Sequence, residues 1–299
     1  MPAVLESTPA AIAGVDELDV MVVDDGSSER TVEVAEAHGV KHVVRHARTA
    51  GLARSFRDGV DYALEHGGDI VVNTDGDNQY PQGRIPDLLA PIFSGEADIV
   101  IAERQAARIA HFSPFKRLMQ RVGTAVVNGA ADTDLPDAAS GFRAYSRTAL
   151  LRLTIVTEFS YAMETIVQAG HKRLRIVSVP VETNPKTRES RLFRNDFQHM
   201  RRSGSAIVRS YLMFKPYGVF VSLAAVFAVL ALVPMVRFVV LRAIHPEHTG
   251  NVQSLIFGAI MAVAALPSLA LGVLADLLRT NRRILEHQPQ RTKEIQYRR

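Results

Sequence analysis

Short apolar runs alternate with helical patterns along the first third of the chain. The strand-like runs occupy residues 18–23, 41–44, 69–75 and 97–103. Between the second and third runs, residues 52–67 carry Leu52, Phe56 and Val60 at helical spacing and end at a glycine. This repeated strand–helix–strand order predicts an α/β fold, with a mostly parallel sheet that is covered by helices on both faces.

Two long uncharged runs follow towards the end of the chain. Residues 216–236 and 249–275 contain no Asp, Glu, Lys or Arg. Each run reaches the roughly 20 apolar residues that a helix needs to cross the hydrocarbon core of a bilayer. We therefore predict a hairpin of transmembrane helices over residues 216–241 and 249–278. A pair of buried core helices is the alternative.

Basic residues flank this predicted hairpin. The chain has 35 basic and 31 acidic residues, and the basic excess lies in residues 201–215 and 279–299, so the remainder is mildly acidic. The positive-inside rule places both flanks in the cytoplasm. The pattern predicts a multi-pass protein of the cell membrane whose two termini and N-terminal domain are cytoplasmic. It disfavours nucleic acid as a partner, because nucleic-acid binders spread basic residues over a folded face.

A further contact with the membrane is expected just before the hairpin. In residues 193–215 apolar side chains recur at helical spacing, and Arg201, Arg202 and Arg209 lie elsewhere around the helix. This pattern predicts an amphipathic juxtamembrane helix in the bilayer interface, with an ordinary helix packed on the domain as the alternative. Residues 1–192 would then form the cytosolic domain, and residues 279–299 a basic cytosolic tail.

Acidic residues stand directly after two of the predicted strands. Asp24 and Asp25 follow the first strand, and Asp75 and Asp77 follow the third. Ligands of open α/β sheets bind at the carboxyl ends of the strands, where both clusters fall. One such pair is usually a solvated turn, but two clusters on one edge favour a ligand site, because like charges need compensation. Paired carboxylates suit Mg²⁺ or Mn²⁺, whereas the absence of Cys excludes thiolate sites and disulfides.

Three stretches carry a family resemblance. VVDDGSSERT, AGLARSFRDGVDYALEHGGDIVVNTDGDNQYPQGRIPDLL and SGFRAYSR resemble glycosyltransferase family 2, in particular its dolichol-phosphate mannose synthase-like, or polyprenyl-phosphate glycosyltransferase, branch. The resemblance implies a GT-A (Rossmann-like) nucleotide-sugar domain. It implies an inverting enzyme that moves a hexose from a nucleotide-sugar, of the GDP-mannose or UDP-glucose type, to a polyprenyl or dolichyl phosphate at the cytoplasmic membrane face.

The resemblance also implies roles for single residues. Mg²⁺ or Mn²⁺ is expected on Asp75, Asp77 and Gln79. The substrates are expected to contact Asp24, Asp25, Gly26, Ser27, Arg143 and Arg191. Catalytic roles are implied for Asp77, Arg104 and Arg117, with Arg104 on a phosphate and Arg117 on the acceptor. None of the ten His is assigned as a base, because a lipid phosphate is already ionised at neutral pH.

One departure from the family pattern concerns its first strand. The family opens with a strand that ends in a Pro-x-x-Asn-Glu-like segment, whereas residues 1–7 resemble the helix after that strand. Because this strand normally lies inside the sheet, its absence is expected to leave unpaired strand edges. Either the start lies upstream, or the chain is a truncated, catalytically inactive scaffold or regulator of the same fold. A processive polysaccharide synthase is disfavoured, because its Gln-x-x-Arg-Trp motif requires Trp and the chain has none. Assembly into a homo-oligomer is compatible with the sequence.

Overall fold

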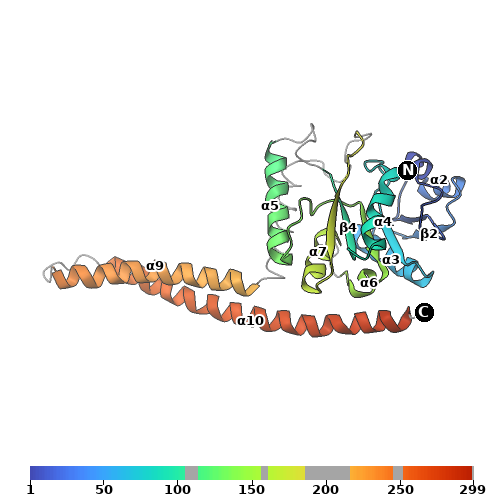
Figure 1. The fold of residues 1–299 in the computed structure, drawn as a ribbon. Helices are drawn as coiled ribbons and strands as arrows, with labels where there is room; N and C mark the ends of the chain where they lie inside the picture. Colours follow the sequence, from blue (N-terminus) through green and yellow to red (C-terminus); the bar gives the residue numbers. More distant parts are fainter. Residues whose placement is uncertain (105–113, 156–160, 186–215, 245–251, 298–299) are drawn as a thin grey trace. The chain divides into compact units, whose positions relative to one another are not determined.

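The computed structural model describes residues 1–104, 114–155, 161–185, 216–244 and 252–297. The chain divides into two compact units, Met1–Ile207 with Gln288–Arg299, and Val208–His287. In the first unit (Figure 1) the elements are α1 (Pro2–Ser7), β1 (Met21–Asp24), α2 (Thr31–Ala37), β2 (His42–Arg45), α3 (Leu52–Glu65), β3 (Ile70–Asn73), η1 (Gln82–Arg84), α4 (Ile85–Phe93), β4 (Ile99–Glu103), α5 (Pro114–Ala131), β5 (Arg143–Ser146), α6 (Arg147–Arg152), α7 (Tyr161–His171) and β6 (Ile176–Pro180). The predicted α/β alternation is confirmed.

The described strands form two separate sheets. β1 pairs with β2 in parallel, and the second sheet has the order β3-β5-β4-β6. In the second sheet β4 and β6 are parallel, while β5 runs antiparallel to both β3 and β4. Within the described part of the chain no ladder joins β1 to β3. β5 is the exception to the predicted mostly parallel arrangement.

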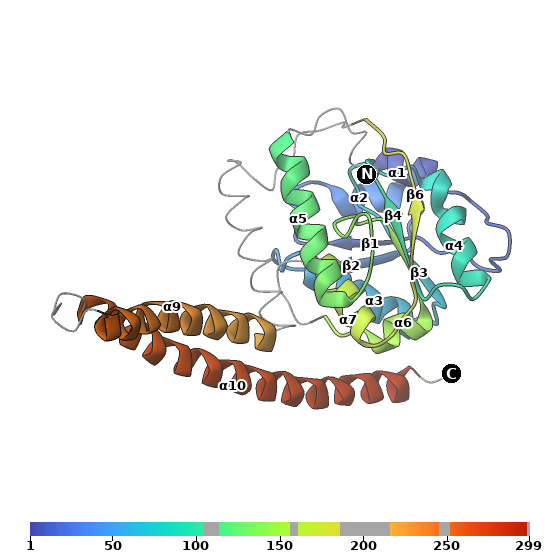
Figure 2. The same cartoon turned by 60° about the vertical axis from the view of Figure 1, so that its left-hand side comes forward.

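Helices cover both faces of the four-stranded sheet, as predicted (Figure 2). On one face Leu88 and Leu89 of α4 belong to the same buried cluster as Val100, Ala102 and Ala144 of the sheet. On the other face lie α5 and α7. The first four residues of β4 are all buried, which explains why that strand reads as a continuous apolar run rather than an alternating one.

Helices α5 and α7 approach each other closely at Gly170. A Cβ atom on Gly170 would lie 1.9 Å from the carbonyl oxygen of Ala131. We therefore expect Gly170→Ala to lower the free energy of unfolding by about 1–3 kcal/mol, because the two helices must move apart. The matched control is Gly129→Ala on α5, where a Cβ would meet nothing within 4 Å. The gain in helix propensity should make the control neutral or stabilising by up to about 1 kcal/mol. Thermal unfolding of both variants checks this, and equal midpoints would contradict it.

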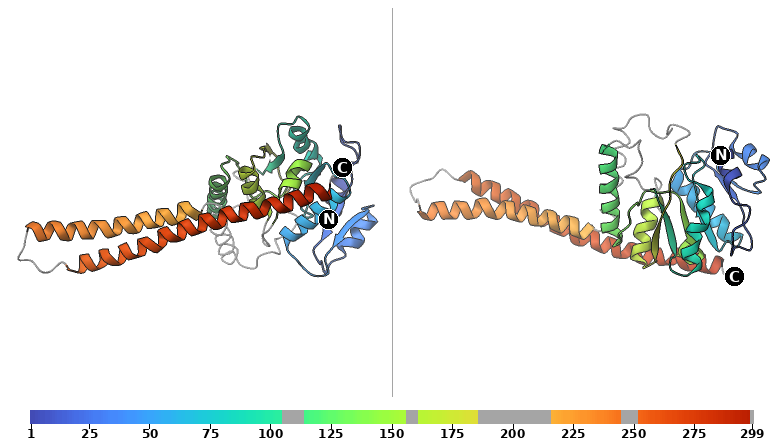
Figure 3. Two further views of the ribbon diagram at one scale, coloured as in Figure 1. Left: turned by 90° about the horizontal axis from the view of Figure 1, so that it is seen from below. Right: turned by 45° about the horizontal axis from the view of Figure 1, so that its top comes forward.

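The second unit consists of α9 (Pro216–Ile244) and the larger part of α10 (Val252–Gln296), which lie side by side in both views of Figure 3. Tyr217–Ile244 and Val252–Leu278 are long and apolar enough to cross a membrane, yet only 11% and 17% of their most apolar stretches is buried. Core helices of a soluble protein would be mostly buried, so that alternative is disfavoured. A Cβ on Gly258 would lie 2.5 Å from Cγ of Met235, and small residues at such contacts are typical of membrane helices.

The last residues of the chain belong to the first unit. Lys293 Nζ lies 2.8 Å from Asp61 Oδ1 of α3. Arg147 donates a hydrogen bond of 2.6 Å to the carbonyl oxygen of Tyr297 and one of 3.0 Å to that of Gly68. The basic tail predicted over residues 279–299 lies largely on the continuation of the second apolar helix, which reaches Gln296.

Candidate active site

Three loops meet at one edge of the four-stranded sheet. β3 ends at Asn73 and leads to Asp75, and β4 ends at Glu103 and leads to Arg104. β5 runs in the opposite direction, and its first residue pairs with Asn73 on one side and with Ile101 on the other. The loop that precedes β5, residues 137–142, therefore reaches the same edge as the carboxyl ends of β3 and β4. This edge is where ligands of open α/β sheets bind.

Asp75 is a carboxylate at this edge whose charged form is disfavoured by burial. A Cβ on Gly141 would lie 3.0 Å from Asp75 Oδ2, so the glycine allows the carboxylate to approach the backbone closely. Burial raises the pKa of Asp75 and the nearby Asp77 raises it further, whereas Arg104 and Arg143 act in the opposite direction. Two carboxylates in this setting are stabilised by a divalent cation, which neutralises both.

The pair of carboxylates fits a metal site that a substrate would complete. Asp77 is exposed, and its Oδ1 accepts a hydrogen bond of 2.9 Å from the backbone N–H of Gln79. No group of three His, Asp or Glu able to hold a metal is found in the described part of the chain. Mg²⁺ often takes only one or two protein carboxylates and completes its shell with water and substrate phosphates. Asp75 and Asp77 are therefore the residues that would hold it.

The raised pKa of Asp75 predicts how stability depends on pH. Its carboxyl group binds a proton more tightly in the folded chain, so its contribution is full below the ordinary carboxyl pKa of about 4 and is lost as the pH rises through the raised value. We expect Asp75→Asn, which cannot ionise, to raise the unfolding midpoint of the metal-free protein at neutral pH but not at acidic pH. The exposed Asp134→Asn is the control and should leave it unchanged. A lower midpoint for Asp75→Asn at neutral pH would refute this prediction.

Arg104 is held by a residue that sequence reasoning missed. Its Nε and Nη2 donate hydrogen bonds of 2.7 Å and 3.0 Å to the two carboxylate oxygens of Asp137. Burial raises the pKa of Asp137, but its hydrogen bonds and the charge of Arg104 outweigh that effect and lower it. Gln120 of α5 adds a bond of 3.3 Å to Asp137 Oδ1. The acid stands just before the SGFRAYSR run, and only the antiparallel direction of β5 brings it to this edge.

Arg143 does not face the candidate site. Its side chain is fully buried, and its guanidinium donates to the carbonyl oxygens of Ser140, Ala138 and Ala162 and to the hydroxyl of Thr165. These bonds tie the loop before β5 to α7. The expected contact with a phosphate is therefore not supported by the position of Arg143, whose role here is to hold the backbone.

Asp24 and Asp25 also turn inwards. Asp24 is buried, and its Oδ1 accepts a hydrogen bond of 3.1 Å from the backbone N–H of Ser27. Asp25 accepts bonds of 2.8 Å and 2.9 Å from the backbone N–H groups of Ala50 and Gly51 at the start of α3. Both carboxylates thus hold the turn after β1 in place. Their expected contacts with a nucleotide stay a prediction.

Gly26 is required in this turn for two reasons. Its φ is +70°, a conformation that residues with a Cβ rarely adopt. A Cβ there would also lie 2.8 Å from the backbone of Arg48 and Thr49. The backbones after β1 and after β2 therefore pack directly on each other.

Two of the predicted site residues cannot be placed as side chains. Arg191 lies outside the described residues, as does the expected juxtamembrane helix over residues 193–215. Arg117 belongs to α5, but its side chain is not among the described ones. Their expected roles on phosphate and acceptor stay predictions.

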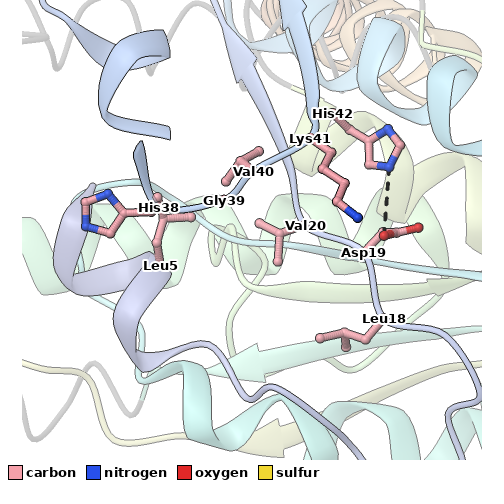
Figure 4. A pocket seen from close by; sticks show the side chains of 9 residues that line it. All are labelled: Leu5, Leu18, Asp19, Val20, His38, Gly39, Val40, Lys41 and His42. Carbon is pink, nitrogen blue, oxygen red and sulfur yellow. Dashed lines mark ion pairs between the residues drawn. The ribbon is translucent and has the colours of Figure 1, made fainter. Parts of the chain in front are cut away.

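A cavity of about 230 Å³ lies elsewhere, near the amino ends of β1 and β2 (Figure 4). It is lined by Leu5, Leu18, Asp19, Val20, His38, Gly39, Val40, Lys41 and His42. Within it His42 Nε2 lies 3.8 Å from Asp19 Oδ1. None of the predicted site residues lines this cavity, so the carboxyl ends of the strands remain the candidate site.

Comparison with known proteins decides the family. Residues 2–154 match the family described as Glycosyl transferase family 2, which is half of the chain. The chain belongs to glycosyltransferase family 2. The resemblance found in the sequence is therefore confirmed, and Asp75 and Asp77 of this family 2 chain lie within the matched region.

Two curated relatives of this family 2 chain illustrate the branch. The low-salt glycan biosynthesis hexosyltransferase Agl6 from Haloferax volcanii is 30% identical over 205 residues, which cover 66% of this chain and 48% of that protein. The undecaprenyl-phosphate mannosyltransferase from Micrococcus luteus is 27% identical over 191 residues, which cover 59% of this chain and 78% of that protein. The matched part thus spans about half the length of Agl6 and most of the second relative. These relatives are consistent with the polyprenyl-phosphate glycosyltransferase branch.

Solved structures confirm the fold. Glucosyl-3-phosphoglycerate synthase from Mycobacterium tuberculosis, in complex with Mn²⁺, uridine-diphosphate-glucose and phosphoglyceric acid, matches with a TM-score of 0.54 at 22% identity. The match covers 71% of this chain and 73% of that chain. The predicted GT-A-like fold of the family 2 domain is therefore shown.

Proposed function

We propose that this family 2 protein transfers a hexosyl group from a nucleotide-sugar to a polyprenyl phosphate at a membrane. The observation that carries the proposal is that one chain joins the acidic edge of Asp75 and Asp77 to two exposed apolar helices, Tyr217–Ile244 and Val252–Leu278. A soluble acceptor would not require the helices. The acceptor named in the undecaprenyl-phosphate mannosyltransferase supports the same choice.

The proposed reaction asks little of the protein as a base. An oxygen of the lipid phosphate attacks the anomeric carbon, the bond from that carbon to the donor diphosphate breaks, and the nucleoside diphosphate leaves. The phosphate is ionised at neutral pH and needs no deprotonation. A bound Mg²⁺ or Mn²⁺, held by Asp75 and Asp77, would neutralise the departing diphosphate. Arg104, oriented by Asp137, keeps a cation beside Asp75.

Transfer to lipid tests the proposal directly. The full chain, reconstituted in bilayers with a long polyprenyl phosphate and Mg²⁺, is incubated with labelled GDP-mannose or UDP-glucose. The labelled product should extract into organic solvent and release its sugar in mild acid, as a glycosyl phosphate does. Label found only in a water-soluble glycan or on protein would refute the lipid acceptor. Failure to bind either donor in the presence of Mg²⁺ would favour the inactive scaffold instead.

The arrangement across the membrane can be tested separately. The basic flanks predict that reporters fused before Met1 and after Arg299 both read as cytoplasmic. A reporter inserted between residues 245 and 249 should read as the opposite side. Termini that report on opposite sides would exclude the hairpin with two crossings.

A further inference from the structure

His46 lies between two carboxylates at the carboxyl ends of β1 and β2. Its Nδ1 is 2.8 Å from Asp25 Oδ1, and its Nε2 is 3.1 Å from Asp58 Oδ2 on α3. Only 11% of the His46 side chain is exposed. Its backbone N–H also donates a bond of 2.9 Å to the carbonyl oxygen of Asp24. One residue therefore connects the turn after β1, the segment after β2 and helix α3.

Both nitrogens of His46 must donate for these contacts to be hydrogen bonds. An ionised carboxylate only accepts, and a neutral imidazole has a single N–H. With one proton, the other nitrogen would turn its lone pair towards a carboxylate oxygen. The doubly protonated imidazolium satisfies both contacts, and charge-assisted bonds of this kind are about twice as strong as neutral ones.

Arginines contact two of the three carboxylates around His46. Asp58 also receives Nε of Arg54 at 3.4 Å and Nε of Arg57 at 3.2 Å, both from α3. On the β1 and β2 side, Arg45 Nε lies 3.7 Å from Asp24 Oδ2. The arginines therefore form ion pairs with Asp58 and Asp24. In the described part of the chain, the basic side chain that contacts Asp25 is His46.

Asp25 depends on His46 and on the first turn of α3. Burial raises the pKa of Asp25, but the bond from His46 and those from Ala50, Gly51 and Ser55 outweigh burial and lower it. The carboxylate thus links an imidazolium to the amino end of a helix, where negative charge is stabilised. Without the His46 side chain, the segment from residue 46 to residue 51 loses one of its contacts with the turn after β1.

We propose that His46 is a positioning residue for the nucleotide-sugar: through its contacts with Asp25 and Asp58 it holds the turn at residues 24–27 against the start of α3, and so keeps this part of the donor site in place. This rests on the proposed function, which places the donor at the carboxyl ends of the strands. His46 touches no reacting atom, so its loss should weaken donor binding and leave the chemical step largely intact.

Donor kinetics of the wild type and of His46→Gln test the proposal. In His46→Gln, KM for the donor should be several-fold higher than in the wild type, while kcat changes less than about twofold. The control is His66→Gln, an exposed histidine at the end of α3, which should behave as the wild type.

Hydrogen exchange of the full chain gives a readout that needs no substrate. After correction for intrinsic pH dependence, the N–H groups of Ala50 and Gly51 should exchange roughly tenfold faster in His46→Gln, the effect of losing one charge-assisted bond. Equal exchange of these N–H groups in the wild type and in His46→Gln overturns the proposal. Faster exchange in His46→Gln without any change in donor KM also overturns the proposal, because the contacts of His46 would then not position the donor. If exchange is faster in His46→Gln but the wild type transfers sugar from no donor, the contacts of His46 hold the turn as proposed and the proposed function is refuted.

Discussion

Asp77→Ala is expected to reduce sugar transfer by at least roughly 10²–10³-fold, the size of effect seen when one group that stabilises developing charge is removed. Asp77 and Asp75 are the two carboxylates that would hold the divalent cation at the edge of the sheet. With one of them gone, the charge of the departing diphosphate would be compensated poorly. The loss should appear in kcat as well as in kcat/KM, because the cation acts mainly on the transition state.

The fold should survive this substitution. Asp77 is exposed, and its charge contributes to the raised pKa of Asp75, so removing it relieves a repulsion. Unfolding midpoints and membrane insertion measured beside the transfer assay check this, with the exposed Asp134→Ala as the matched control. Near-normal transfer by Asp77→Ala at saturating Mg²⁺ would remove Asp77 from the metal site.

Arg104→Met is expected to destabilise the protein by about 3–5 kcal/mol, because it leaves a buried carboxylate without its partner. The side chain of Asp137 is only 2% exposed and that of Arg104 14%. The double variant Arg104→Met with Asp137→Leu replaces the pair by apolar groups of similar size and should recover most of the loss. Thermal unfolding of the single and double variants measures the coupling between the two sites.

Activity separates the two roles of this pair. If Arg104 supplies a cation at the active edge, transfer should stay low in the double variant although its stability is restored. Losses of stability that simply add in the double variant would show that the two side chains are not coupled, contrary to the hydrogen bonds that join them.

The strands and helices of the domain could be predicted because each pattern reports burial directly. The apolar run of β4 and the helical spacing of α3 predict their elements without knowledge of the rest of the fold. The direction of β5 could not be read in the same way, because a short buried strand has the same composition in either direction. Since that direction brings Asp137 beside Arg104, the partner of Arg104 was missed.

Side-chain roles were harder to predict than elements. The motif Ser-Gly-Phe-Arg is compatible with an arginine that binds phosphate and with one that is buried and holds the backbone. The buried position of Arg143 supports the second role. Likewise, the order Asp24-Asp25-Gly26 indicates a turn but not which way its carboxylates face. His46 carried no signal in the sequence, because its two carboxylate partners lie on other elements and are brought together only by the fold.

Lys293 and Tyr297 are synthesised only after both apolar helices have been made. Domains generally fold as units during synthesis, beginning from the amino end. Residues of the first unit such as Asp61 and Arg147 can therefore reach folded positions long before their C-terminal partners exist. The glycosyltransferase unit completes its contacts last of all, once the ribosome has passed α9 and α10. A nascent chain arrested within α10 would leave this face of α3 uncovered, so translation itself sets the order in which the unit is finished.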